Sequence, residues 1–99
     1  MYHVEARIVD TALHVTDRAL QAGDINLARW ALTQGLLVSP DHEDLITGCL
    51  RTEYQAGNMD KVNDLINHLS ATARRLGVDL NDDTTRIIDS LTHITRNAS

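Results

Sequence analysis

Five histidines and one cysteine are the residues of this chain best suited to bind a metal ion or act in catalysis. The histidines are His3, His14, His42, His68 and His93. No two of them are four residues apart, the spacing that places two ligands on one face of a helix, so no zinc-binding pair is expected. Cys49 lies in an apolar stripe with no basic residue one turn earlier, which favours a buried thiol over a nucleophile. The sequence therefore predicts no catalytic residue and no bound metal.

Loops that bind phosphate or calcium are also missing from the sequence. The five glycines stand singly and do not form a glycine-rich loop. Asp82 and Asp83 are adjacent, whereas a calcium loop spaces its oxygen ligands along the chain. We expect one of these two aspartates to cap a helix. No cofactor and no enzymatic activity are predicted.

The most informative pattern is a repeated helix-ending signal. Gln21-Ala22-Gly23-Asp24 returns as Gln55-Ala56-Gly57-Asn58, and the offset (55 − 21 = 34) is the period of tetratricopeptide-type hairpins. Glycine can adopt the left-handed conformation that ends a helix, and Asp or Asn can then cap the next one. The repeat predicts two consecutive helical hairpins.

Apolar periodicity supports helices throughout the chain and no strands. We expect helices at residues 3–22, 25–38, 42–56, 59–76 and from 82 or 83 to about 96. The fold class is thus all-α: a five-helix, tetratricopeptide-like superhelix of two hairpins, with the last helix as a cap over the unfinished array.

Two features of these helices concern their surfaces. The apolar face of the first helix is so broad that it implies packing on more than one side. It comprises Val4, Ile8, Ala12, Val15, Ala19 and Ala22, widened by Val9, Leu13 and Leu20. Trp30 lies off the inner stripe of the second helix, where it either covers the hairpin or contacts a partner. Gly48 in the third helix predicts a close helix crossing, because glycine otherwise costs a helix roughly 1 kcal/mol.

Composition limits the possible partners. The chain has 99 residues, enough for one domain spanning 1–99, and its net charge of −5 disfavours direct contact with nucleic acid. No apolar run is long enough to cross a membrane, and no signal peptide is visible. The single cysteine fits a cytoplasmic protein.

The predicted binding surface is the concave side of the two hairpins, formed by the first helix of each. The residues expected there are Asp10, Leu13, Asp17, Leu20, Asp44, Thr47, Arg51 and Tyr54. The apolar members would anchor a protein partner and the charged members would set specificity. Alternatively, the apolar members only pack against neighbouring helices.

Two segments carry a resemblance to a known family. The run from Leu27 to Leu36, followed by Ser39-Pro40-Asp41-His42-Glu43-Asp44-Leu45, resembles the bacterial transcriptional activator domain of actinobacterial regulators of the antibiotic-regulatory-protein type and of a branch linked to LysM modules. The ending Ala73-Arg74-Arg75-Leu76-Gly77-Val78-Asp79, with Thr84-Thr85-Arg86 opening the last helix, is similar to the family's closing signature and closing helix. The resemblance covers roughly residues 10–95, although Leu80-Asn81 stands where the family commonly has a proline-rich spacer.

This resemblance implies a non-enzymatic module for protein interaction and oligomerisation in a transcriptional regulator. In the family the domain follows other modules, often a winged-helix DNA-binding domain, so Met1 is expected to open a fragment of a larger protein. The implied partners are a second copy or other domains of the parent regulator, with no nucleic acid or membrane. The alternative is a free-standing tetratricopeptide-like adaptor that binds a peptide tail in the concave groove.

Overall fold

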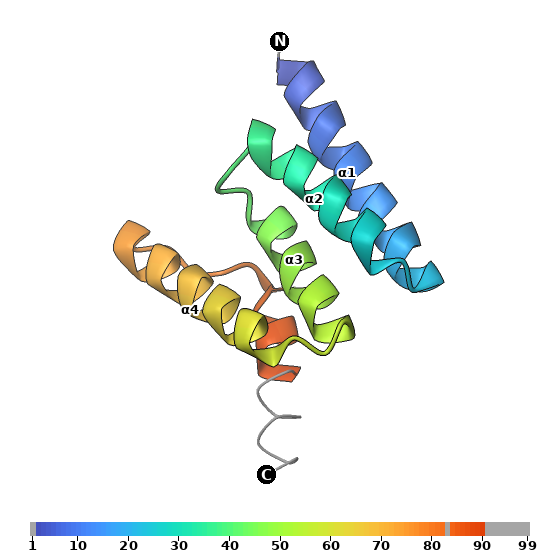
Figure 1. Ribbon diagram of the computed structural model, residues 1–99. Helices are drawn as coiled ribbons and strands as arrows, with labels where there is room; N and C mark the ends of the chain where they lie inside the picture. The colour runs from blue at the N-terminus through green and yellow to red at the C-terminus, as the bar shows by residue number, and fades with distance from the viewer. Residues whose placement is uncertain (1, 83, 91–99) are drawn as a thin grey trace.

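A computed structural model describes residues 2–82 and 84–90, with side chains from residue 6 onward. All regular structure in these residues is helical (Figure 1). The elements are α1 (Tyr2–Ala22), α2 (Ile25–Val38), α3 (Glu43–Gln55) and α4 (Met59–Leu76), followed by a helical segment at residues 84–90. The all-α prediction is confirmed, while the expected continuation of the last helix beyond residue 90 lies outside the described residues.

Both predicted hairpin turns are present, and they have the same geometry. Gly23 and Gly57 have φ values of 76° and 80°, in the left-handed region that favours glycine. After each glycine the next backbone N–H reaches back five residues: Asp24 N donates to Ala19 O at 2.8 Å, and Asn58 N donates to Glu53 O at 2.9 Å. These bonds satisfy carbonyls at the helix ends. The 34-residue repeat is therefore a repeat of backbone structure.

The predicted helix caps are confirmed only in the first hairpin. Asp24 Oδ1 accepts a hydrogen bond from Leu27 N at 3.1 Å. Asn58 makes no such bond from its side chain, and its Nδ2 instead donates to Glu53 Oε1 at 3.3 Å. The Asn58 side chain thus hydrogen-bonds a carboxylate of α3 and not the first turn of α4.

The start of the last helical segment was predicted wrongly, and α3 begins one residue later than expected. The residue at the N-terminal boundary of α3 is His42, which was expected to be the first residue of the helix. The last helical segment is capped by Asn81, whose Oδ1 accepts from Thr84 N at 2.8 Å, where we expected Asp82 or Asp83. Asn81 is held in place by α3, because its backbone N–H donates to Glu43 Oε1 at 2.9 Å. Such a long-range contact cannot be read from local sequence.

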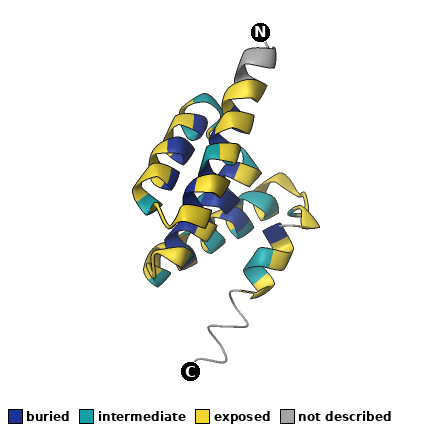
Figure 2. Ribbon diagram, turned by 90° about the vertical axis from the view of Figure 1, so that its right-hand side faces the viewer, coloured by how far each residue is buried: buried dark blue, intermediate teal, exposed yellow. Residues whose placement is uncertain are grey.

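The helices pack in the order of the chain. α1 and α2 form one hairpin, α3 lies against both of them, and α4 packs on α3 (Figure 1). Buried residues line the inner faces of the helices (Figure 2). Thr47 Oγ1 and Thr84 Oγ1, both buried, lie 2.9 Å apart in a hydrogen bond, and Ile87 and Ile88 pack on the core of the second hairpin. The last segment therefore covers the end of the second hairpin.

Within the described residues no helix is both long and apolar enough to span a membrane.

The crossing of α2 and α3 is unusually close at two glycines. A Cβ at Gly48 would lie 2.8 Å from Leu32 Cδ2, which confirms the predicted crossing at this residue. A Cβ at Gly35 would lie 2.8 Å from Leu45 Cδ2 and 3.1 Å from Ala12 Cβ. Because Gly35 also faces α1, it marks the point where three helices meet.

Alanine substitutions at the two glycines should have unequal effects. Gly35→Ala should lower the free energy of unfolding by about 1–2 kcal/mol, because overpacking outweighs the gain in helix propensity and the Ala12 methyl group cannot rotate away. Gly48→Ala should cost less, because only the end of the flexible Leu32 side chain must move. Urea unfolding measures both changes, and an equal or larger loss for Gly48→Ala would contradict this view of the crossing.

Candidate functional site

The predicted concave surface is partly assembled as a groove between α1 and α3. A hollow of about 390 Å³ is lined by five of the eight predicted residues. They are Leu13, Asp17, Asp44, Thr47 and Arg51. Arg51 Nη1 and Asp17 Oδ1 form an ion pair at 3.0 Å, and these residues occupy equivalent positions in the two repeats. Arg86 and Ile87 of the last helical segment also line this groove, so that segment closes part of it.

The other three predicted residues lie elsewhere. Leu20 is buried and packs with Ala19 and Ala28 between α1 and α2. Tyr54 is half-buried against the core of the second hairpin. Asp10 is exposed and does not line the hollow. Two of the three proposed apolar anchors are thus engaged in packing within the chain.

A part-buried ion pair between α2 and α3 was not anticipated from the sequence. Arg29 donates two hydrogen bonds to Glu53, from Nε to Oε2 at 2.9 Å and from Nη2 to Oε1 at 2.8 Å. The Glu53 side chain is only 9% exposed, whereas that of Arg29 is 45% exposed. The Arg29 hydrogen bonds hold the pKa of the Glu53 carboxyl below its usual range, against the effect of burial. A pairing across 24 residues leaves no signal in local periodicity.

Cys49 and His42 are reactive side chains that lie partly inside the molecule. Burial, with a further contribution from the charge of Glu53, raises the pKa of the Cys49 thiol, so the thiol stays protonated at neutral pH. His42 is half-buried, and its Nδ1 is buried without a hydrogen-bond partner among the described residues. Among the described residues no group of three His, Cys, Asp or Glu side chains could hold a metal ion.

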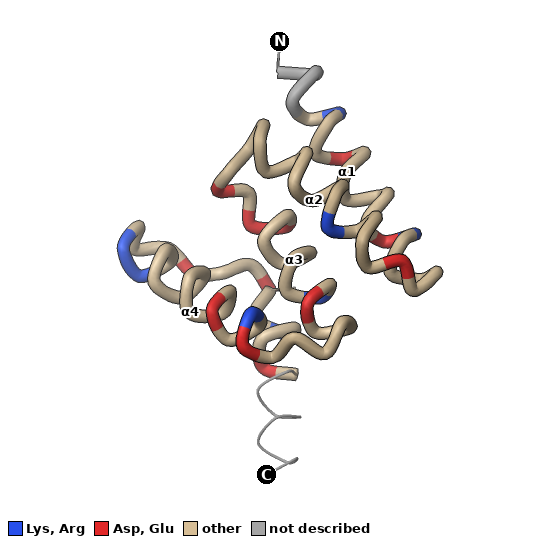
Figure 3. Tube along the Cα trace, in the orientation of Figure 1, with Lys and Arg blue, Asp and Glu red and all other residues tan. Residues whose placement is uncertain are grey.

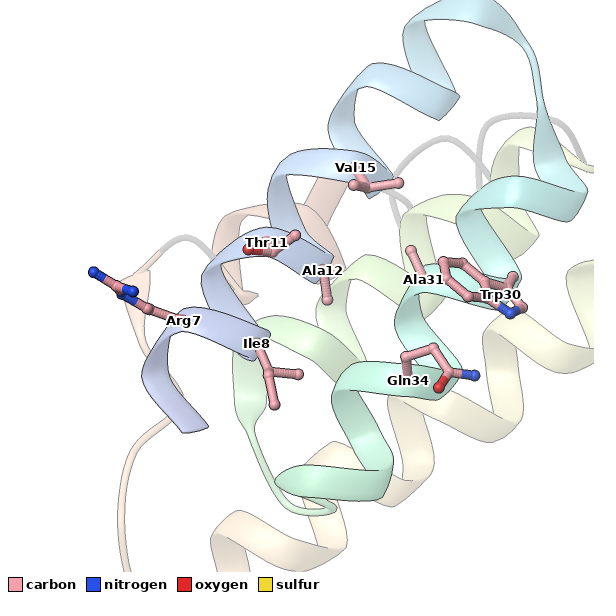
Figure 4. Close-up of a pocket in the computed structure, with 8 residues that line it drawn as sticks. All are labelled: Arg7, Ile8, Thr11, Ala12, Val15, Trp30, Ala31 and Gln34. Atoms are coloured by element: carbon pink, nitrogen blue, oxygen red, sulfur yellow. The ribbon is translucent and has the colours of Figure 1, made fainter. Parts of the chain in front are cut away.

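The second surface feature is an apolar hollow on the outer side of the first hairpin. It has a volume of about 250 Å³ and lies between α1 and α2 (Figure 4). Its lining residues are Arg7, Ile8, Thr11, Ala12, Val15, Trp30, Ala31 and Gln34. Trp30 is 60% exposed, so it does not seal the hairpin in the way a lid would.

Charged groups are sparse around this apolar hollow. Arg7 is the one charged residue among those lining it, and Arg29 is the one charged residue in α2. Both acidic and basic residues occur along α1, α3 and α4 (Figure 3). Ile8, at 37% exposed, and Trp30 thus belong to an apolar surface that water contacts at a free-energy cost.

The Arg29–Glu53 pair should make stability depend on pH. Because the folded-state pKa of Glu53 lies below the ordinary value of about 4.3, its contribution is complete above about pH 5 and is lost as pH falls through the folded-state pKa. Glu53→Gln should therefore lower the free energy of unfolding by about 1 kcal/mol at pH 7, and the difference from the unmodified chain should shrink below about pH 4.

Asp17→Asn is the matched control, since the Asp17–Arg51 pair is exposed on both sides. It should change the free energy of unfolding by about 0.5 kcal/mol or less. Urea titrations at pH 3, 5 and 7 measure both variants. A pH-independent loss in Glu53→Gln would contradict the assigned electrostatics.

Comparison with known proteins identifies no relative. No family model matches this chain, and neither does any curated protein or any solved structure. The similarity of the segments Leu27 to Leu45 and Ala73 to Asp79 to the bacterial transcriptional activator domain therefore remains a prediction from the sequence.

Proposed function

We propose that this chain is a non-enzymatic protein-interaction and oligomerisation module of a cytoplasmic bacterial transcriptional regulator. The single observation that carries the proposal is the apolar hollow of the first hairpin, with Trp30 exposed at its edge. Tryptophan is enriched among the residues that dominate protein–protein binding energy. The sequence resemblance supplies the regulatory context.

The charge distribution supports a protein partner over nucleic acid. The chain carries 14 acidic and 9 basic residues, which gives a net charge of −5. Two of the arginines, Arg29 and Arg51, are held in ion pairs with acidic residues of the chain itself. A surface of this kind repels a phosphate backbone, so contact with DNA would come from another module of the parent regulator.

The proposal is tested by association in solution. The chain should self-associate, or should bind the DNA-binding portion encoded in the same reading frame, with a dissociation constant in the micromolar range that is typical of modest interfaces. Sedimentation velocity of the chain alone, and of its mixture with that portion, measures both. A chain that stays monomeric at 100 µM or so and binds no part of the parent protein would overturn the proposal.

A peptide-binding adaptor is the second candidate, and the groove between α1 and α3 favours it. That groove has a volume of about 390 Å³ and presents Asp17, Asp44 and Arg51 to solvent. If it binds a peptide tail, a peptide array should give a selective hit that Arg51→Ala weakens at least tenfold. Tyr54→Ala is unsuitable as a probe because Tyr54 packs in the core. An array without selective hits would exclude the adaptor.

A further inference from the structure

We propose that the apolar hollow of the first hairpin binds an amphipathic α-helix of a partner protein, in the position that α2 occupies against the second hairpin. This inference rests on the proposed interaction function and names the site and the chemistry of the partner. Its basis is the internal repeat, which supplies within one chain both an occupied and an unoccupied copy of the same surface.

The 34-residue shift relates the two surfaces residue by residue. Ile8, Thr11 and Val15 of α1 correspond to His42, Leu45 and Cys49 of α3. On the second helix of each hairpin, Ala31 corresponds to Leu65. The apolar hollow on α1 and α2 is therefore equivalent, by the repeat, to the surface of α3 and α4 that faces α2.

In the second hairpin this face is covered by a helix. Leu45 and Cys49 belong to a core cluster in which Leu32 and Leu36 of α2 also pack. Cys49 and Leu65 line the same hollow as these two leucines. The approach is close, because a Cβ at Gly35 would lie 2.8 Å from Leu45 Cδ2. The covering helix thus presents leucines beside a small residue.

In the first hairpin the equivalent face is open. Ile8 and Thr11 are exposed and Val15 is half-buried, although their counterparts at 42, 45 and 49 are half-buried or buried. Trp30 extends the apolar surface, since its counterpart in the second hairpin is the exposed Asp64. The broad apolar face of α1 thereby has one side buried against α2 and α3 and one side without a partner.

A second copy of the folded chain does not offer the stripe that covers the second hairpin. The matching stripe in this protein is Ala28, Leu32 and Gly35 of α2, and all three residues are buried inside the molecule. The opposite end of the described array is covered by the segment at 84–90. A partner helix with leucines flanking a Gly or Ala has the required chemistry.

The probe is a peptide with the sequence of residues 25–38, with alanine in place of its tryptophan, held helical by a side-chain bridge on its polar face. Trp30 is the only tryptophan of the chain, so its fluorescence reports on the hollow. Added to the full chain, the peptide should produce a saturable blue shift of the Trp30 emission. Ile8→Asp and Thr11→Arg should each weaken binding at least tenfold, and both replace exposed residues that folding tolerates.

Val78→Asp is the matched control, because Val78 is 57% exposed and lies outside the hollow. It should bind the peptide like the unmodified chain, and a scrambled helical peptide should not bind. Absence of a saturable shift, equal binding of the scrambled peptide, or undiminished binding by Ile8→Asp and Thr11→Arg would each overturn the inference.

Sedimentation of the same variants separates this inference from the proposed function. A dimer that Ile8→Asp dissociates would show that a second copy occupies the hollow, and this also overturns the inference. Self-association that is insensitive to Ile8→Asp, with no peptide binding, would leave the proposed interaction function standing and remove only the hollow as its site.

Discussion

The close crossing of α2 on α3 is the contact on which the rest of the molecule depends. At Gly35 and Gly48 the two helices approach until leucine side chains of one contact the backbone of the other. This approach buries Leu32 and Leu45 and brings Arg29 within hydrogen-bonding distance of Glu53. It also sets the position of one hairpin relative to the other, and hence the groove between α1 and α3. Small residues are required because a larger side chain would hold the helices apart.

Buried threonine hydroxyl groups form hydrogen bonds in two ways. Some donate to a carbonyl of their own helix, and one pair forms a hydrogen bond between two helices. Thr16 and Thr52 donate to the carbonyls of Ala12 and Gly48, four residues earlier. Thr47 instead pairs with Thr84 of the last helical segment. Since an unpaired buried hydroxyl is costly, this bond favours one placement of the segment over others. The end of the second hairpin is closed by a specific contact as well as by apolar packing.

The two ends of the described array differ, and this asymmetry carries the functional argument. One end is covered by the segment at 84–90, and the other presents Ile8, Val15 and Trp30 around an apolar hollow. The internal repeat is the basis for proposing a helix as the ligand of this hollow, because α2 packs on the equivalent face of the second hairpin. The groove between α1 and α3 is more polar, and its ion pair already satisfies two of its charges. We therefore place the proposed interaction surface at the apolar hollow on the outer side of α1 and α2.

The sequence by itself determined the helices and the two glycine turns, because each of these depends on residues within a few positions of one another. It also predicted the close crossing at Gly48, because a glycine inside a helix is otherwise unfavourable. The 34-residue period also predicted that five of the eight groove residues lie together, since it places them on corresponding helix faces. Only the tertiary structure decided that Leu20 is buried and Tyr54 packs against the core. It also decided that Asn81 is the last cap and that Arg29 pairs with Glu53. Each of these outcomes depends on which side chain lies opposite in space, and a pairing between 24 and 38 positions away has no counterpart in local periodicity.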